Sequence, residues 1–197
     1  MKLAKILLAG SLVASFAFAE GAFVGIQGGY DHSIDVAAND FDTDLEGGHF
    51  TIGVKGGFDF GNYRAYTQYN FKAKDTYAEI SSGEDNLKLD ASMHQFLVGA
   101  DFTPTLSENL KLAVGPYLGY SLLKLKLSGT IDGESGSESE NQSGFILGAK
   151  LGLIYGFGAG EFEAGIKSDY SWHSAGDSEV DIDVGSFGGY LGYNFKF

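Results

Sequence analysis

The sequence predicts an all-β protein: a closed, eight-stranded, antiparallel up-and-down β-barrel whose strands cross a membrane. Three observations predict this fold class. Glycine (30 residues) and aromatic residues (14%) are abundant in the 197-residue chain, which has two prolines and no cysteine. Apolar and polar residues alternate along eight segments, which is the period of a β-strand with one apolar face. The connections between these segments are alternately short and long, so the two ends of the barrel differ.

Residues 1–19 are predicted to be a signal peptide, which leaves residues 20–197 as one barrel domain. Met1–Lys5 carries two lysines, Ile6–Ala17 is apolar, and Ala17-Phe18-Ala19 has the A-x-A pattern of a cleavage site. The apolar run is shorter than the ~20 residues that a membrane-spanning helix needs. We therefore expect export and cleavage after Ala19.

The eight predicted strands follow one another with a period of two. Alternation is clearest in the second, third and seventh of them and weaker in the others. In order, the predicted strands are Ala22–His32, Phe50–Phe60, Tyr63–Lys72, Leu89–Thr103, Leu110–Leu127, Gly144–Tyr155, Glu161–His173 and Ser186–Phe197. In the fifth strand the parity slips near Ser121–Leu123, which predicts a β-bulge there.

The connections between these strands sort by length and by charge. The short ones are Gly61-Asn62, Pro104–Asn109 and Gly156–Gly160. The long ones are Ser33–Gly48, Lys74–Lys88, Gly129–Ser143 and Ser174–Gly185. The long connections hold 17 of the 26 acidic residues. Alternation alone also fits a soluble barrel with its apolar side chains inside, but sorted connections are typical of outer-membrane barrels, whose apolar side chains face lipid. We therefore expect short periplasmic turns and long acidic extracellular loops.

If the apolar side chains face lipid, the polar residues at alternate strand positions face the lumen, where opposite charges can pair. An Arg or Lys on the lipid face would cost about 2–4 kcal/mol near the midplane, whereas paired interior charges are tolerated. The predicted lumen charge network is Lys55, Arg64, Lys72, Asp101, Lys111, Lys150, Glu161, Glu163, Lys167 and Asp169. Eight strands leave an interior wide enough only for side chains or one small ligand. We expect the network to be a structural plug.

Aromatic residues gather at the ends of the strands next to the short turns. Amphipathic rings at the headgroup level form the girdles of membrane barrels. The predicted aromatic girdle is Phe58, Phe60, Tyr63, Tyr155 and Phe157.

The final segment, Tyr193-Asn194-Phe195-Lys196-Phe197, resembles the C-terminal signature of bacterial outer-membrane β-barrels, a terminal aromatic residue with apolar residues at alternate positions before it. With its eight strands, the chain is similar to the small barrels of Gram-negative bacteria typified by the transmembrane domain of outer membrane protein A and the protein X/Ail group. The resemblance implies that the outer-membrane assembly machinery recognises Tyr193, Phe195 and Phe197. It also implies a monomer in contact with outer-membrane lipid and lipopolysaccharide, with a host or surface ligand at the loops.

Composition excludes several function classes. The formal net charge of −13 argues against a nucleic-acid partner, because neutralising phosphates requires a Lys/Arg face. Without cysteine there is no thiolate nucleophile and no Cys-based zinc site. The acidic run at residues 40–46 lacks the Gly and Glu that an EF-hand loop requires, so we predict no metal site and no cofactor.

Three functions stay open in this order. The first is surface interaction, adhesion or support of the envelope by a closed barrel with exposed loops. The second is a narrow channel for ions or small solutes. The third is a lipid A-modifying enzyme, for which Asp169, Ser171 and His173 are candidates on one strand face. Same-face neighbours on a strand lie ~6.5–7 Å apart, too far for a hydrogen-bonded triad. We therefore predict no catalytic residues.

Overall fold

A computed structural model describes residues 21–38, 41–42, 47–82, 85–131, 134–174 and 181–197 of this chain. The predicted signal peptide lies outside these residues. The strands are β1 (Ala22–Ala38), β2 (Phe41–Asp42), β3 (Gly47–Asp59), β4 (Tyr63–Ser82), β5 (Asp85–Phe102), β6 (Thr105–Ser107), β7 (Leu110–Ile131), β8 (Glu134–Phe157), β9 (Gly160–Ser174) and β10 (Asp181–Lys196). None of the described residues belongs to a helix long and apolar enough to cross a membrane.

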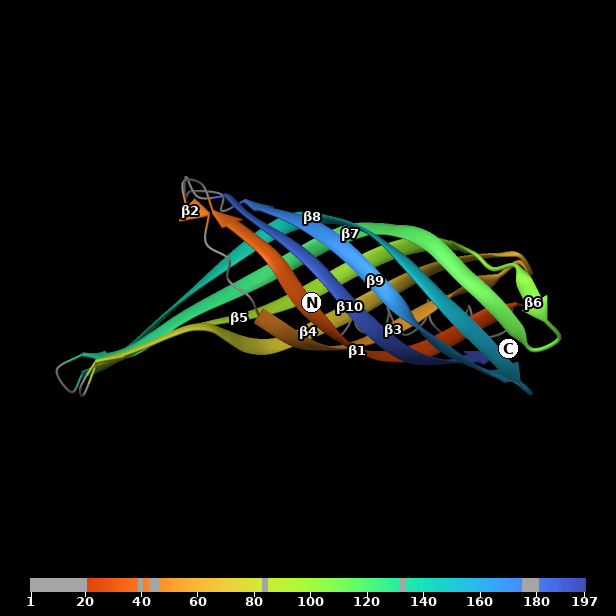
Figure 1. The fold of residues 1–197 in the computed structure, drawn as a ribbon, viewed down its shortest axis with the longest axis horizontal. Coiled ribbons are helices and arrows are strands. Elements are labelled where there is room, and N and C mark those ends of the chain that lie inside the picture. Colours follow the sequence, from red (N-terminus) through yellow and green to blue (C-terminus); the bar gives the residue numbers. More distant parts are fainter. Residues whose placement is uncertain (1–20, 39–40, 43–46, 83–84, 132–133, 175–180) are drawn as a thin grey trace, which may run out of the picture.

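Eight long strands close into an up-and-down barrel (Figure 1). Neighbours pair antiparallel in the order β10-β9-β8-β7-β5-β4-β3-β1, and pairing of β10 with β1 closes the ring. The short strands β2 and β6 pair only with β1 and β7, respectively, within the described chain. The predicted fold class, a closed eight-stranded antiparallel barrel, is confirmed.

The end of the barrel with the short turns is built as the sequence predicts. Gly61 and Gly158 have φ of +92° and +58° in the β3–β4 and β8–β9 turns, a left-handed conformation that favours glycine. The Asp59 carboxylate accepts a hydrogen bond from the Gly61 amide at 2.8 Å and stabilises its turn. The amide of Phe197 donates to the carbonyl of Ala22 at 2.9 Å, so both ends of the barrel sequence meet here.

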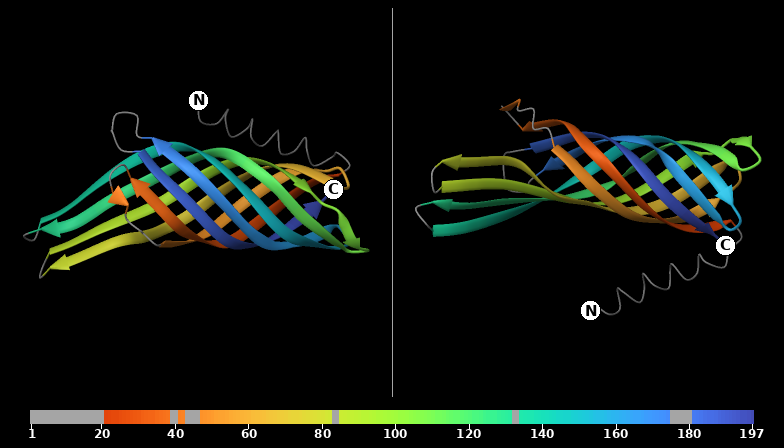
Figure 2. Two further views of the ribbon diagram at one scale, coloured as in Figure 1. Left: turned by 45° about the horizontal axis from the view of Figure 1, so that its top comes forward. Right: turned by 60° about the horizontal axis from the view of Figure 1, so that its bottom comes forward.

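At the opposite end the strands are much longer than predicted. The expected loops Lys74–Lys88 and Gly129–Ser143 are mostly strand: β4 pairs with β5 as far as Ser82, and β7 pairs with β8 as far as Ile131. The barrel wall on either side is shorter, because β3 pairs with β4 only up to Lys72. As Figure 2 shows, β4, β5, β7 and β8 therefore extend beyond the barrel as a four-stranded sheet, which we call the projecting sheet.

The predicted bulge at Ser121–Leu123 is wrong. β7 keeps one continuous register with β8 along its whole length. The register shifts of the long strands lie instead in β4, between Lys72 and Ala78, and in β1, between Ser33 and Asp35. The parity of β7 slips because Leu123 points inward and is buried against Ala91 and Met93, so an apolar cluster covers the upper end of the polar interior.

Candidate functional site

The interior of the barrel contains three clusters of ion pairs. The lower cluster lies at the short-turn end and centres on Asp59, whose Oδ2 receives Arg64 at 3.0 Å, Lys111 at 3.4 Å and Lys196 at 3.0 Å. Glu161 receives Arg64 and, at 3.3 Å, Lys196. Strands β3, β4, β7, β9 and β10 thus contribute to one cluster, which joins walls of the barrel that are not sheet neighbours.

The middle cluster centres on Glu163. Its carboxylate receives Lys55 Nζ at 2.5 Å and Lys150 Nζ at 3.0 Å, and Lys150 also reaches Asp101 at 2.8 Å. The Tyr190 hydroxyl donates to Glu163 at 3.0 Å and the Asn194 amide at 3.2 Å. Such a fully bonded carboxylate offsets the large cost of taking charges out of water.

The upper cluster pairs two lysines with two aspartates. Asp31 receives Lys167 at 2.9 Å and Lys72 at 3.4 Å, and Lys72 also lies 3.6 Å from Asp169. Asp169 in turn accepts the Tyr117 hydroxyl at 2.9 Å. The three clusters together hold seven cations and six anions, each in at least one ion pair.

Side chains fill the space between these clusters. The tyrosines Tyr66, Tyr117 and Tyr190 are buried inside the barrel. The Tyr66 ring packs over its cross-strand partner Gly99. A Cβ at residue 99 would lie only 2.4 Å from this ring, so the position needs glycine. The cavity between these rings has a volume of about 10 Å³, room for one water. The described interior is therefore closed by its own side chains.

Nine of the ten residues that the sequence assigned to the lumen network are buried in these clusters, and Lys111 is half-buried at the lower mouth. Sequence reasoning missed Asp31 and Lys196, which carry much of the pairing. Asp31 is an even number of residues from the buried Gln27, and Lys196 from the buried Asn194. Counting every second residue along each strand would therefore have assigned both to the lumen.

The exterior of the barrel is apolar. Ile26, Ile52 and Leu191 are each at least 64% exposed, and these residues come from neighbouring strands. A shallow depression of about 880 Å³ on this face is also lined mostly by apolar side chains. So large an exposed apolar surface has no counterpart on an ordinary soluble monomer.

The aromatic side chains of the predicted girdle lie near the short turns. Phe157 stacks on Phe162 with ring centroids 5.3 Å apart, Phe58 lies 6.2 Å from Phe60, and Tyr63 contacts a ring on β5. Tyr155 is 52% exposed on the same face.

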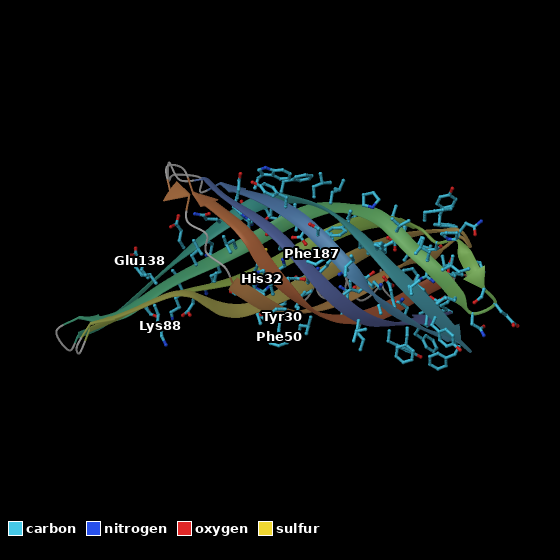
Figure 3. All side chains as sticks on the ribbon, viewed as in Figure 1. Tyr30, His32, Phe50, Lys88, Glu138 and Phe187 are labelled. Carbon is cyan, nitrogen blue, oxygen red and sulfur yellow. The ribbon has the colours of Figure 1, made fainter. Side chains whose placement is uncertain are left out.

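The sequence analysis missed a second aromatic group farther up the barrel. It includes Tyr30 against Phe50 at 5.2 Å and Phe145 against Trp172 at 6.0 Å. In Figure 3, Tyr30 and Phe50 lie together on the outside of the barrel. These aromatic residues occupy the alternate strand positions that face outward, and this pattern in the sequence could have identified them.

The projecting sheet has two different faces. On the inward parity, Leu125 and Leu127 of β7 pair with Glu140 and Glu138 of β8. Leu127 and both glutamates are exposed, so this face is apolar and acidic. On the opposite face Lys124 and Lys126 are exposed. Figure 3 shows Glu138 and Lys88 on opposite sides of the sheet.

The candidate catalytic residues do not come together. Asp169 binds in the upper cluster, Ser171 donates to the carbonyl of Val184, and His173 Nε2 lies 2.8 Å from the hydroxyl of Ser121. Ser121 and His173 are both buried inside the barrel. Among the described residues, no group of three His, Asp or Glu side chains is placed to hold a metal ion, and the acidic run 40–46 is largely outside them.

No family model and no curated protein matches this chain. Among solved structures, Ail, the attachment invasion locus protein of Yersinia pestis, in complex with the heparin analogue sucrose octasulfate, gives a TM-score of 0.56 at 20% identity. The match covers 90% of this chain and 100% of that one. Neisserial surface protein A gives 0.50 at 19% identity, covering 90% of this chain and 98% of that one. The fold is therefore that of small outer-membrane β-barrels.

Proposed function

We propose that this protein is an integral outer-membrane barrel with a closed lumen that recognises a partner through its projecting sheet. The exposed apolar exterior supports the membrane location, because side chains such as Ile52 and Leu191 stand outward while charged residues are inside. The short turns then face the periplasm and the projecting sheet faces the outside of the cell. Outer-membrane barrels carry short turns on the periplasmic side and longer connections on the extracellular side, which supports this orientation.

Transport through the lumen is the less favoured function. The three ion-pair clusters span the interior, and the cavity between them is about 10 Å³. Ions would have to separate buried pairs such as Lys55 with Glu163 to pass, and breaking such pairs is costly. We therefore assign the clusters a structural role, and the same role to the buried Ser121–His173 pair.

The observation that carries the recognition function is the edge of β8. Residues 134–142 of β8 pair with β7 alone, because within the described chain β9 begins to pair only at Ser143. Residues 136–141 are all exposed, on both faces of the strand. No second described strand covers this edge, so an extended segment of another protein can add to it as a further strand.

The side chains around this edge define the chemistry of the partner. Glu138 and Glu140 are exposed beside the apolar side chains of Leu125 and Leu127. An added strand that places its basic side chains on this face, at every second position, would pair with the two glutamates, whereas a polyanion would be repelled. The proposed partner is therefore basic, unlike the heparin analogue sucrose octasulfate in the complex with Ail.

A peptide-binding experiment tests the proposal. A synthetic strand of alternating Lys and Val should bind the folded barrel and protect the amides of residues 134–142 from hydrogen exchange, while a Glu-Val strand should not. Glu138→Lys/Glu140→Lys should abolish binding, whereas Lys124→Gln/Lys126→Gln on the opposite face is the matched control. Equal binding of both peptides, or protection elsewhere in the barrel, would refute recognition at this edge.

A shortened variant separates recognition from support of the envelope. The described residues 129–131 and 134–142 lie beyond the barrel wall, so deletion of the segment 129–142 should leave the heat-dependent gel mobility of a closed barrel intact. Loss of peptide binding with a normal envelope supports recognition. Intact binding with a weakened envelope would instead assign the projecting sheet to envelope support.

A further inference from the structure

Two lysines on the outer face of β7 stand out because they have no ion-pair partner among the described residues. Lys124 and Lys126 are exposed, and neither makes an ion pair with any residue that the structure describes. All other lysines and arginines with described side chains have partners: seven lie in the three lumen clusters and Lys88 makes its own contacts. In the described part of this acidic chain, two cations without an ion pair thus lie at one place.

That place follows directly on the apolar exterior. Phe96, Tyr120 and Phe145 form one aromatic row across β5, β7 and β8, and each is about half exposed. Leu122 follows on the same face of β7, and Lys124 is the next outward residue. Two same-face steps along a tilted strand put Lys124 about 10 Å above the aromatic row. Since aromatic rings mark the membrane interface, the two lysines stand at the level of the lipid headgroups.

The neighbours of these lysines suit an anion with several acceptor oxygens. Lys124 pairs across the sheet with Ser92 and Asn141, and Ser139 is one of the cross-strand partners of Lys126. The other partner of Lys126, Asp90, is buried and has contacts of its own, so its carboxylate does not lie open on this surface. Ammonium, hydroxyl and amide groups on one face are the donors that bind phosphate.

We infer that Lys124 and Lys126 bind the phosphate of a lipid headgroup in the leaflet that surrounds the projecting sheet. The inference rests on the proposed membrane location and adds the lipid class to it. The acyl chains lie against the apolar exterior below, and the phosphate is held by the two ammonium groups above it. Lipid binding on this face and peptide binding on the acidic face can therefore occur together.

Native mass spectrometry of the detergent-solubilised full chain tests this site. The lipids are dioleoyl phosphatidic acid, dioleoyl phosphatidylcholine and cholesteryl hemisuccinate, an anion without phosphate. The wild-type protein should bind phosphatidic acid about tenfold or more tightly than zwitterionic phosphatidylcholine, since each lysine near an anionic surface contributes roughly a fivefold gain in affinity. It should also prefer phosphatidic acid to cholesteryl hemisuccinate, because a phosphate monoester offers the two ammonium groups more charge and more acceptor oxygens than a carboxylate does. Lys124→Gln/Lys126→Gln should lose this preference, and Lys124→Arg/Lys126→Arg should keep it.

Three results would overturn the inference: an unchanged preference in the Gln variant, equal binding of cholesteryl hemisuccinate, or displacement of the lipid by an equal concentration of inorganic phosphate. Glu138→Gln/Glu140→Gln on the other face is the charge control and should leave the preference intact. Heat-dependent gel mobility is measured for every variant. A normal shift with a lost preference localises the effect to these lysines, whereas a wild-type chain without the shift refutes the barrel itself.

Discussion

Replacing Glu163 by Gln perturbs the middle cluster at its centre. Lys55 Nζ, whose side chain is 2% exposed, has Glu163 as its one carboxylate partner among the described residues. Lys150 keeps Asp101 at 2.8 Å after the change. The glutamine carbonyl can still accept hydrogen bonds from its neighbours. The net consequence is therefore one buried ammonium group without a counter-ion.

The magnitude follows from that orphaned charge. Removing one partner of a buried ion pair costs about 3–5 kcal/mol. Because the amide oxygen retains part of the hydrogen bonding to Lys55, we expect Glu163→Gln to lower the free energy of unfolding by about 3 kcal/mol. The double variant Lys55→Met/Glu163→Gln removes both charges and leaves the Lys150–Asp101 pair. It should regain about 2 kcal/mol of this loss.

Urea unfolding in lipid vesicles measures these free energies, with the fluorescence of Trp172 as the signal, since the chain has one tryptophan. The gel shift between unheated and boiled samples verifies that each variant closes. A cost below about 1 kcal/mol for Glu163→Gln, with no gain in the double variant, would mean that water screens the interior charges. The description of the lumen as a dry plug would then be wrong.

Three further predictions concern the faces, the lumen and assembly. Ile166→Arg puts a charge on the lipid-facing exterior and should lower the free energy of unfolding by about 2–4 kcal/mol in the same assay. Lys167→Gln in the lumen should cost less, because Asp31 keeps its ion pair with Lys72. The reverse order would mean that the two faces are misassigned. In planar bilayers the wild-type barrel should show no steady conductance, and regular single-channel steps would restore the channel function. Phe197→Ala should lower the yield of the heat-shifted form in cells but not its stability in vesicles, and an unchanged yield would remove the assembly role.

Which side chains enter the lumen could be predicted from the sequence because side-chain direction on a strand alternates strictly. Lys55, Glu163 and Lys167 lie on polar parities, and the structure brings all three inside. Their partners could not be predicted. Lys55 and Glu163 are 108 residues apart, and Lys167 meets Asp31 across 136 residues. Such contacts depend on how far each strand is staggered when the sheet closes, which no local pattern records.

The projecting sheet was hidden for a different reason. Residues 136–141 are exposed to solvent on both faces of the strand, so neither face requires apolar side chains. The segment therefore shows no alternation of apolar and polar residues and has the composition of a loop. Its strand character comes from the backbone pairing of β8 with β7, which continues the register of the barrel below.

By itself the sequence determined the strand number, the apolar and polar faces and the short-turn end, because each depends on residues within one strand or one turn. Closure of the sheet decided the rest: the three ion-pair clusters, the open edge of β8 and the position of Lys124 above the aromatic row. These features join strands that are distant in sequence, and they exist only once the register around the ring is set.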